Sequence, residues 1–253
     1  MNNFKAKLFK KKHLFGTVLS ELYSPNIPIL FKSIGFDYFI IDCEHGYFDF
    51  SAVAVLAAVS KNADIPMIVR VPSISRECIL KYMDMGVGGL LVPMVSSPED
   101  VSKVVEYAKY KPLGQRGITT IRAHNNYLPN DIIAYMKNSN EDTILLAQIE
   151  TVKGLENTSK IAEIQGLDGL IVGPNDLTSD MGIPGQYENE QFAEAVQMIH
   201  KHTLASGKLT GIIISNTKVI TECRKIGMEL LCWSSELGMI MKGAKSGLQE
   251  IIG

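Results

Sequence analysis

The most constraining feature of this sequence is a regular alternation of short apolar runs with longer segments of helical spacing. Eight apolar runs predict strands at residues 14–20, 38–44, 67–72, 89–95, 143–150, 169–174, 209–215 and 229–234. The segments that follow them predict helices at residues 25–34, 50–62, 75–86, 98–110, 152–165, 190–206, 216–227 and 235–250. This alternation is typical of βαβ units and a parallel sheet. Eight such units in about 240 residues predict an α/β fold, the (β/α)8 TIM barrel.

Residues that typically begin or end helices occur at the ends of the predicted helices. Ser97 is placed as a helix N-cap, with Pro98 at the first helical position and acids at Glu99 and Asp100. Glycines just before the next strand are predicted to end five helices, at Gly35, Gly86, Gly166, Gly207 and Gly227. An open doubly wound sheet is the alternative, but neither a GxGxxG motif nor a P-loop follows the first strand.

Length and composition indicate a globular protein with one large core. The chain has 253 residues, of which 46% are hydrophobic and 21% charged, as in ordinary globular proteins. We therefore expect a single barrel domain over residues 1–253. Its main irregularity is a long inserted loop and helix at about residues 111–142, between the fourth helix and the fifth strand, and long insertions of this kind tend to be functional or mobile.

Charge and hydropathy argue against several kinds of partner. A net charge of −2 gives no electrostatic reason to bind nucleic acid or an anionic membrane, and no apolar run approaches the roughly 18–20 residues that span a bilayer. The basic start, residues 1–16, lacks the pattern of a signal peptide and is expected to form a solvated helical turn. Four cysteines without a CxxC pair predict buried, reduced thiols and a cytoplasmic protein, with a nucleophilic Cys43 as the minor alternative.

Ionisable and polar side chains gather at the ends of the predicted strands. They are Asp42 and Glu44 in the second strand, His45 in the loop after it, Arg70 at the end of the third, Gln148 and Glu150 in the fifth, and Asp176 after the sixth. An acid in such a place is often only the N-cap of the next helix. A barrel, however, brings these ends to one rim, where its chemistry takes place. Burying these ions together costs several kcal/mol each unless they pair or bind something, so we predict a functional site.

The residue types indicate a chemistry for this site. Glu150 and Asp176 offer hard carboxylate oxygens, which suit Mg²⁺ or Mn²⁺ better than structural zinc. Arg70 would supply a fixed cation where negative charge develops, as on an enolate oxygen. Histidine as a residue type has an unperturbed pKa that suits a general base near neutral pH, which makes His45 the candidate base of this group. Backbone amides in the Gly173-Pro174-Asn175 turn could hold a carboxylate. Together these groups predict proton or carbon–carbon chemistry next to a carbonyl.

Several stretches of the sequence are similar to one known family. GFDYFIIDCEHG, IVRVP, YMDMGVGGLLVPMV, YKPLGQRG, AQIET and GLDGLIVGPNDLTSDMG, in this order, resemble the HpcH/HpaI aldolases, which are metal-dependent class II aldolases of 2-oxo acids. The resemblance extends from Gly16 to the SSELGMI segment near the C-terminus. It implies a (β/α)8 barrel whose C-terminal helix is exchanged between subunits, and a homo-hexamer built as a trimer of dimers. It further implies a lyase that cleaves a 4-hydroxy-2-oxo acid into pyruvate and an aldehyde through a metal-stabilised enolate.

The same resemblance implies a role for each site residue. Glu150 and Asp176 would ligate the divalent metal, Mg²⁺ or Mn²⁺ with Co²⁺ as an alternative, and Asp42 and Glu44 would hold metal-bound water. The catalytic residues would be His45 as the acid–base group, Arg70 as the enolate stabiliser, and Asp84, which would reach the histidine of an adjacent subunit. Substrate contacts would come from Arg70, Gln148, Gly173, Pro174, Asn175 and Asp176.

The sequence departs from the family at a few positions. Val18 stands where a tryptophan is usual, Lys111 where a proline is usual, and Glu236, after Trp233, where an Asp is common. These positions are expected near the aldehyde side of the site, so the acceptor is open. Alternatives are a citrate-forming condensation of oxaloacetate with acetyl-CoA, and a non-catalytic metabolite-binding barrel. The roles of Arg116 and Arg122 are also open, since loop arginines are usually solvated.

Overall fold

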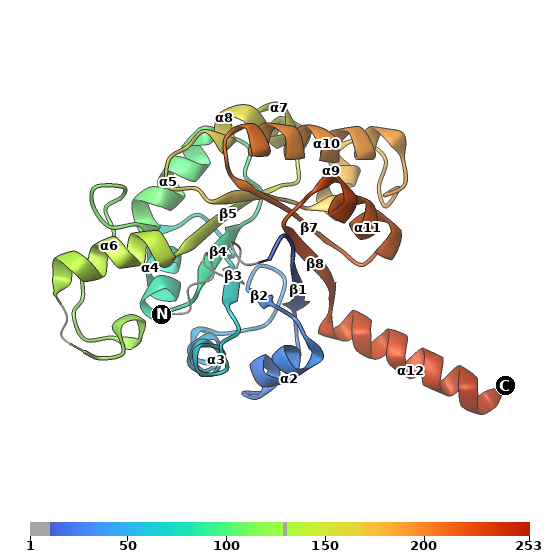
Figure 1. Ribbon diagram of the computed structural model, residues 1–253, viewed down its shortest axis with the longest axis horizontal. Coiled ribbons are helices and arrows are strands. Elements are labelled where there is room, and N and C mark those ends of the chain that lie inside the picture. The colour runs from blue at the N-terminus through green and yellow to red at the C-terminus, as the bar shows by residue number, and fades with distance from the viewer. Residues whose placement is uncertain (1–10, 129–130) are drawn as a thin grey trace.

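Eight strands form a closed parallel barrel in a computed structural model that describes residues 11–128 and 131–253 (Figure 1). The strands follow one another in sequence order, and β8 pairs with β1. They are β1 (Leu14–Leu19), β2 (Tyr38–Asp42), β3 (Met67–Arg70), β4 (Gly89–Val92), β5 (Ile144–Ile149), β6 (Gly169–Val172), β7 (Leu209–Ile214) and β8 (Leu230–Ser235). All eight predicted strands are present. The barrel is confirmed, and the open sheet is ruled out.

Helices surround the barrel, and most lie where the sequence pattern predicted them. They are α2 (Ile27–Ile34), α3 (Phe50–Asn62), α4 (Arg76–Asp84), α5 (Pro98–Ala108), α6 (Ile132–Asp142), α7 (Val152–Glu156), α8 (Thr158–Ala162), α9 (Pro174–Asp180), α10 (Glu190–Ala205), α11 (Thr217–Ile226) and α12 (Glu236–Ile252), with a short 3₁₀ helix η1 (Ala123–Asn125). The helical turn expected near the start of the chain lies largely in residues 1–10, outside the described residues.

The single helix predicted over residues 152–165 is wrong, because the chain breaks there into α7 and α8. Asn157 separates the two helices, and its side-chain amide donates a hydrogen bond of 3.0 Å to the carbonyl of Ser96. Asn side chains often compete with helical hydrogen bonds in this way. The break therefore arises from a tertiary contact that periodicity does not reveal.

Local helix signals behave as the sequence predicts. Ser97 and Asp100 form a reciprocal capping box at the start of α5, with Pro98 at its first position. The five glycines expected to end helices, Gly35, Gly86, Gly166, Gly207 and Gly227, all have positive φ. A positive φ favours glycine because it has no Cβ. These signals set the lengths of the helices and so the loops at the rim.

Two apolar cores hold the barrel together. A small inner core fills the barrel and includes Ile40, Ile68 and Leu146, while a larger outer core lies between the strands and the helices. Side chains two residues further along a strand point to the same face. Asp42, Arg70 and Gln148 therefore lie above this inner core, at the carboxyl end of the barrel. This alternation positions the candidate site.

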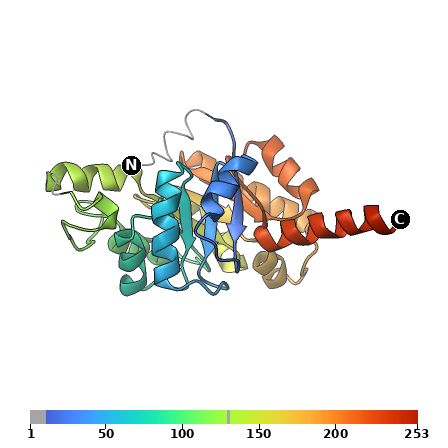
Figure 2. The same cartoon turned by 90° about the horizontal axis from the view of Figure 1, so that it is seen from below.

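Two elements extend beyond the barrel (Figures 1 and 2). The predicted insertion contains η1 and α6, which lie together to one side. The C-terminal helix α12 projects outward on the other side in both views. Of the helices that the structure describes, none is long and apolar enough to cross a membrane.

Candidate active site

Arg70 and Asp42 form a two-point ion pair at the rim of the barrel. They lie side by side because β2 and β3 pair with Asp42 opposite Arg70. Arg70 donates from Nε to Asp42 Oδ1 at 2.9 Å and from Nη2 to Oδ2 at 2.5 Å. Burial alone would raise the pKa of Asp42, but the hydrogen bonds and charge of Arg70 outweigh it and lower this pKa below its usual range. The carboxylate is therefore a fixed anion.

Glu44 and His45 follow on the next turn of chain. Their backbone N–H groups donate to Asp42 Oδ1 at 3.0 and 3.3 Å. Glu44 Oε2 lies 3.4 Å from Arg70 Nη1 and 3.8 Å from His45 Nε2. Burial raises the pKa of Glu44 despite the opposing charges of Arg70 and His45. The His45 side chain is 69% exposed, so its ring is accessible from the mouth of the barrel.

Glu150 is the most deeply buried acid of the set. The residue is 2% exposed, and its Oε1 accepts a 2.5 Å hydrogen bond from the backbone N–H of Met94. Among the described residues, its other oxygen, Oε2, has no hydrogen-bond partner. Burial, followed by the nearby negative charges of Glu44 and Asp176, raises the pKa of Glu150 to about 7. A cation at Oε2 would relieve this unfavourable burial.

Gln148 and Gly173 lie directly beside Glu150. A Cβ on Gly173 would lie 2.5 Å from Glu150 Oε2 and 2.6 Å from Gln148 Nε2. A side chain at this position would displace both of these polar groups, so glycine here keeps Glu150 and Gln148 in place. Gln148 is 3% exposed, and within the described part of the chain its Oε1 also has no hydrogen-bond partner. The two side chains thus offer a pair of oxygens to a ligand.

Asp176 lies in the first turn of α9, the short helix that follows β6. Gly173 is the N-cap and Pro174 the first helical residue, and the first amides of a helix have no partner within the helix. Asp176 is exposed, and its charge is felt by both Glu44 and Glu150. Asn175 is exposed, and its Oδ1 accepts a 2.6 Å hydrogen bond from the hydroxyl of Tyr187. The predicted turn is therefore present at the rim.

Asp84 lies at the opposite end of the barrel. It is the last residue of α4, which runs back toward the amino ends of the strands. Arg116 Nη2 donates to Asp84 Oδ1 at 2.7 Å, and His124 Nε2 lies 3.9 Å from the same oxygen. Within one chain, Asp84 and His45 are therefore on different faces. The Arg116 side chain is only 1% exposed, so the expectation of a solvated arginine was wrong there, whereas Arg122 is exposed.

Glu236, which stands where an Asp is common in the family, has its carboxylate taken up by hydrogen bonds within the chain. Its carboxylate is 4% exposed and accepts hydrogen bonds from the N–H groups of Ser20, Glu21 and Leu22 at 2.7–3.1 Å, and from the hydroxyl of Ser20. It therefore ties the end of β8 to the loop after β1. The length of Glu lets the carboxylate span this gap, a contact that sequence alone did not reveal.

The remaining departures from the family have different surroundings. Val18 is partly buried against the inner core, and Lys111 is exposed. Trp233 donates from its indole to the carbonyl of Ser215 at 3.2 Å. All four cysteines are buried free thiols, as predicted. Burial raises the pKa of Cys43 to about 11, so this thiol is protonated at neutral pH and is a poor nucleophile.

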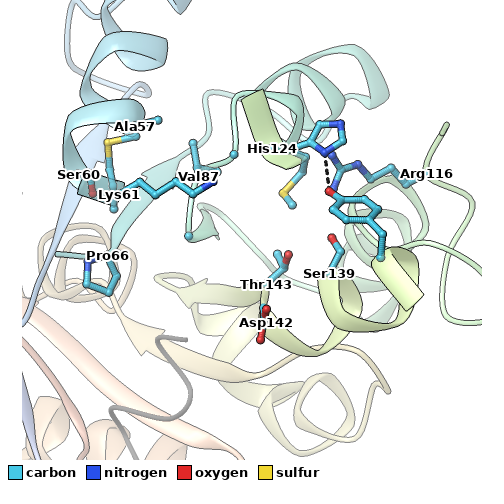
Figure 3. Close-up of a pocket in the computed structure, with 15 residues that line it drawn as sticks. Ala57, Ser60, Lys61, Pro66, Val87, Arg116, His124, Ser139, Asp142 and Thr143 are labelled. Carbon is cyan, nitrogen blue, oxygen red and sulfur yellow. Dashed lines mark hydrogen bonds between the residues drawn. The ribbon is translucent and has the colours of Figure 1, made fainter. Parts of the chain in front are cut away.

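A separate cavity of about 70 Å³ lies at the amino ends of β3, β4 and β5 (Figure 3). It is bounded by α3, α4 and the insertion, which contributes Arg116 and His124. The dashed line in Figure 3 marks the hydrogen bond between Nδ1 of His124 and the hydroxyl of Tyr135. Of the described residues around this cavity, none belongs to the predicted site. Active sites of TIM barrels lie at the carboxyl end, so we assign this cavity to the support of the insertion.

The rim residues fit a divalent cation. Asp42, Glu44 and Glu150 each interact with the guanidinium of Arg70. The charge of Asp176 is felt by Glu44 and Glu150, so four carboxylates and one guanidinium share the rim. The surplus negative charge is unfavourable unless a cation compensates it. Across residues 11–128 and 131–253, no group of three or more His, Cys, Asp and Glu side chains is arranged to hold a metal. A pair of protein ligands completed by water and substrate oxygens is the usual arrangement for Mg²⁺.

Comparisons with known proteins agree with this description. Residues 22–242 match the model of the HpcH/HpaI aldolase/citrate lyase family. The chain is 30% identical over 246 residues to a hydroxypyruvate/pyruvate aldolase of Deinococcus radiodurans, covering 97% of this chain and 88% of that protein. It is 30% identical over 239 residues to a 5-keto-4-deoxy-D-glucarate aldolase of Escherichia coli, covering 94% of this chain and 92% of that protein.

Two solved structures have the same fold as this chain. The crystal structure of an HpcH/HpaI aldolase from Desulfitobacterium hafniense matches with a TM-score of 0.94 and 31% identity, covering 98% of this chain and 95% of that one. The crystal structure of the citrate synthase SbnG matches with a TM-score of 0.89 and 27% identity, covering 99% of this chain and 97% of that one.

Proposed function

This chain belongs to the HpcH/HpaI aldolase/citrate lyase family, and we propose that it is a divalent-metal-dependent aldolase that cleaves a 4-hydroxy-2-oxo acid into pyruvate and an aldehyde. The observation that carries the proposal is the group of four carboxylates at the rim, three of them interacting with Arg70, with the second oxygen of Glu150 buried and facing Gly173. Two relatives at 30% identity are named as aldolases. The aldehyde itself is left open by the departures at Val18 and Lys111.

Glu150 and Asp176 are the residues that would hold the cation. Asp42 and Glu44 would orient water bound to it. When present, a Mg²⁺ or Mn²⁺ ion supplies Lewis-acid stabilisation of negative charge on the oxygens of a 2-oxo acid. The remaining steps belong to the protein. The first-turn amides of α9 would bind the substrate carboxylate, and Gln148 would contact the oxygens beside it.

Arg70 would stabilise negative charge on the substrate, and His45 would transfer protons. Arg70 is held in place by both oxygens of Asp42, so its position does not need to change as an enolate oxygen develops charge. His45 is exposed at the mouth and would remove the proton of the 4-hydroxyl group during cleavage. It would return a proton when the reaction runs toward synthesis. Asp84 of a neighbouring subunit would orient this imidazole.

Assembly as a homo-hexamer, a trimer of dimers, with α12 exchanged between subunits is part of the same proposal. Its support is the apolar surface left open on this chain. Phe15, on the outer face of β1, is 41% exposed, and Ile34 of α2 is 57% exposed. A helix that covered β8 and β1 in the ordinary way would bury them. The projecting α12 cannot do so for its own barrel.

A citrate-forming condensation is the second candidate. It is favoured by the match to a citrate synthase of 27% identity over almost the whole chain. The two candidates share the enolate chemistry and differ in the acceptor. Release of pyruvate from 4-hydroxy-2-oxo acids supports the aldolase, whereas citrate formed from oxaloacetate and acetyl-CoA supports the synthase.

Exchange of the C3 protons of pyruvate in deuterium oxide tests the proposed chemistry directly. We expect the protein loaded with Mg²⁺ or Mn²⁺ to catalyse this exchange, EDTA to stop it, and Glu150→Gln to abolish it. Lys225→Ala, an exposed residue in the last turn of α11 and so toward the opposite end of the barrel from the rim, is the control. Failure of the wild type with every divalent metal would exclude the enolate mechanism and leave a binding protein.

A further inference from the structure

Met94 has a backbone conformation that is unusual for its residue type. It follows β4 at the carboxyl rim, and its φ is +54°. A residue with a Cβ is disfavoured in this left-handed region, so such residues persist only where the surrounding structure enforces them. Ser234, near the end of β8, shares the property with a φ of +58°. Backbone outliers of this kind cluster at functional sites.

The conformation of Met94 directs its backbone N–H at Glu150. The donor lies 2.5 Å from Oε1, and this bond fixes one of the two oxygens of a carboxylate that is 2% exposed. The other oxygen, Oε2, faces Gly173, where a Cβ would lie only 2.5 Å away. Met94 and Gly173 therefore constrain Glu150 from two sides. One oxygen is anchored and the other is presented to the site.

The side chain of Met94 does not explain the strained backbone. Met94 is 53% exposed, whereas its neighbour Val95 is fully buried. The backbone after Met94 is held by the barrel, since the carbonyl of Val95 lies 2.6 Å from where a Cβ of Gly154 would be. The Ser96 hydroxyl also donates to the carbonyl of Met94 at 3.4 Å. The turn is thus enforced by its flanks.

We propose that Met94 is a positioning residue, whose strained backbone N–H anchors Glu150 Oε1 so that Oε2 is aimed at a divalent cation. The inference rests on the proposed function, because it needs a cation at Glu150. It assigns the role to the amide and not to the thioether. Partners of this kind, which orient a metal ligand, typically change metal affinity by about 10–100-fold when they are removed.

Three substitutions separate the backbone from the side chain. Met94→Ala removes the thioether but keeps the N–H and a Cβ, so we expect Mn²⁺ affinity within about twofold of the wild type. Met94→Gly also keeps the N–H, with the same expectation. Met94→Val strongly disfavours a positive φ because of β-branching, which should withdraw the N–H and lower Mn²⁺ affinity about tenfold or more.

Isothermal titration of the metal-free proteins with Mn²⁺, without substrate, is the measurement. The thermal unfolding midpoint of each metal-free protein is also measured, which distinguishes a loss of Mn²⁺ affinity from a loss of folding. A weak affinity in Met94→Ala equal to that of Met94→Val, or an unchanged affinity in a folded Met94→Val, would overturn the inference. If Met94→Val does not fold, the alanine and glycine variants still decide it, because weakened binding in both contradicts a role for the amide. Absence of Mn²⁺ binding in the wild type would instead refute the proposed function.

Discussion

Arg70 and Asp42 show how one buried pair sets the charge of the rim. Their side chains are 15% and 5% exposed, and two hydrogen bonds join them. We expect Arg70→Ala to lower the free energy of unfolding by about 3 kcal/mol, because it leaves a buried carboxylate without its cation. Urea denaturation of the metal-free protein measures this loss.

Arg70→Lys provides the matched comparison. It keeps the positive charge but loses the planar fork that binds both oxygens of Asp42. We expect a smaller loss of stability, while the rate of pyruvate proton exchange still falls about tenfold or more. A lysine variant with the wild-type exchange rate would show that the charge of Arg70 matters and its geometry does not.

His124 makes the stability of the folded protein depend on pH, and its contribution can be measured separately. Burial, with a contribution from the positive charge of Arg116, lowers its pKa from 6.5 to about 4. The unfolded chain therefore takes up this proton at a higher pH than the folded protein does. Stability from neutral His124 is complete above about pH 6.5 and is lost as the pH falls toward 4.

His124→Gln is the variant that tests this dependence. Glu150, with a pKa raised from 4.5 to about 7, acts in the opposite sense over part of the same range, because its folded form holds the proton more tightly. Because Glu150 is present in both proteins, its contribution cancels in the difference in unfolding free energy between wild type and variant. We expect that difference to shift in favour of the variant between pH 6.5 and 4 in metal-free protein. If the difference in unfolding free energy did not change with pH, the pKa of His124 would not be lowered in the folded protein.

Sequence patterns predicted single residues well only where a periodic rule applied. Alternation placed Asp42, Arg70 and Gln148 above the inner core correctly, because the pleat has a fixed period. The bonds of Glu236 to the loop after β1 and the burial of Arg116 were not predicted. Both depend on contacts between residues 32 or more apart in the chain, and rules based on neighbouring residues do not predict such contacts.

At the scale of elements, a buried lysine attaches the insertion to the barrel. Lys109 follows α5 and is 1% exposed. Its Nζ donates to the carbonyls of Asn140 in α6 at 2.7 Å and of Thr143 at 2.6 Å. We expect Lys109→Met to cost about 2–3 kcal/mol, since it leaves buried carbonyls without a donor. Lys103→Met, an exposed site on α5, should change stability by less than about 0.5 kcal/mol. Urea denaturation distinguishes the two.

The strands were more predictable than the helices for a physical reason. Each strand of a parallel barrel is buried on both faces, so it must be apolar over most of its length. A surface helix tolerates a break wherever a side chain finds a better partner, as Asn157 does with Ser96. The length of α12 was predicted, but its direction away from the barrel depends on what covers it, which one chain does not contain.

At the scale of the whole molecule, α12 carries an apolar surface that its own barrel leaves exposed. Exposed fractions are 53% for Ile240, 55% for Met241, 56% for Leu248 and 82% for Ile251. Patches of this kind mark protein interfaces. We expect Ile240→Glu combined with Met241→Glu to reduce the molar mass measured by light scattering, and Lys245→Glu on the same helix to leave it unchanged. An unchanged mass in the double variant would argue against an interface on α12.

A test of complementation between subunits connects this assembly to catalysis. Asp84 and His45 lie at opposite ends of one barrel, so they can act together only across an interface. Asp84→Asn and His45→Ala should each be nearly inactive alone. Co-expressed in equal amounts, they should regain activity, because about a quarter of the sites in a randomly mixed assembly combine an intact His45 with an intact Asp84 from the neighbour. The exchange of pyruvate protons and the cleavage of a 4-hydroxy-2-oxo acid both measure it. If Asp84 acts only within its own chain, the mixture should remain as inactive as its components, since no chain in it carries both residues.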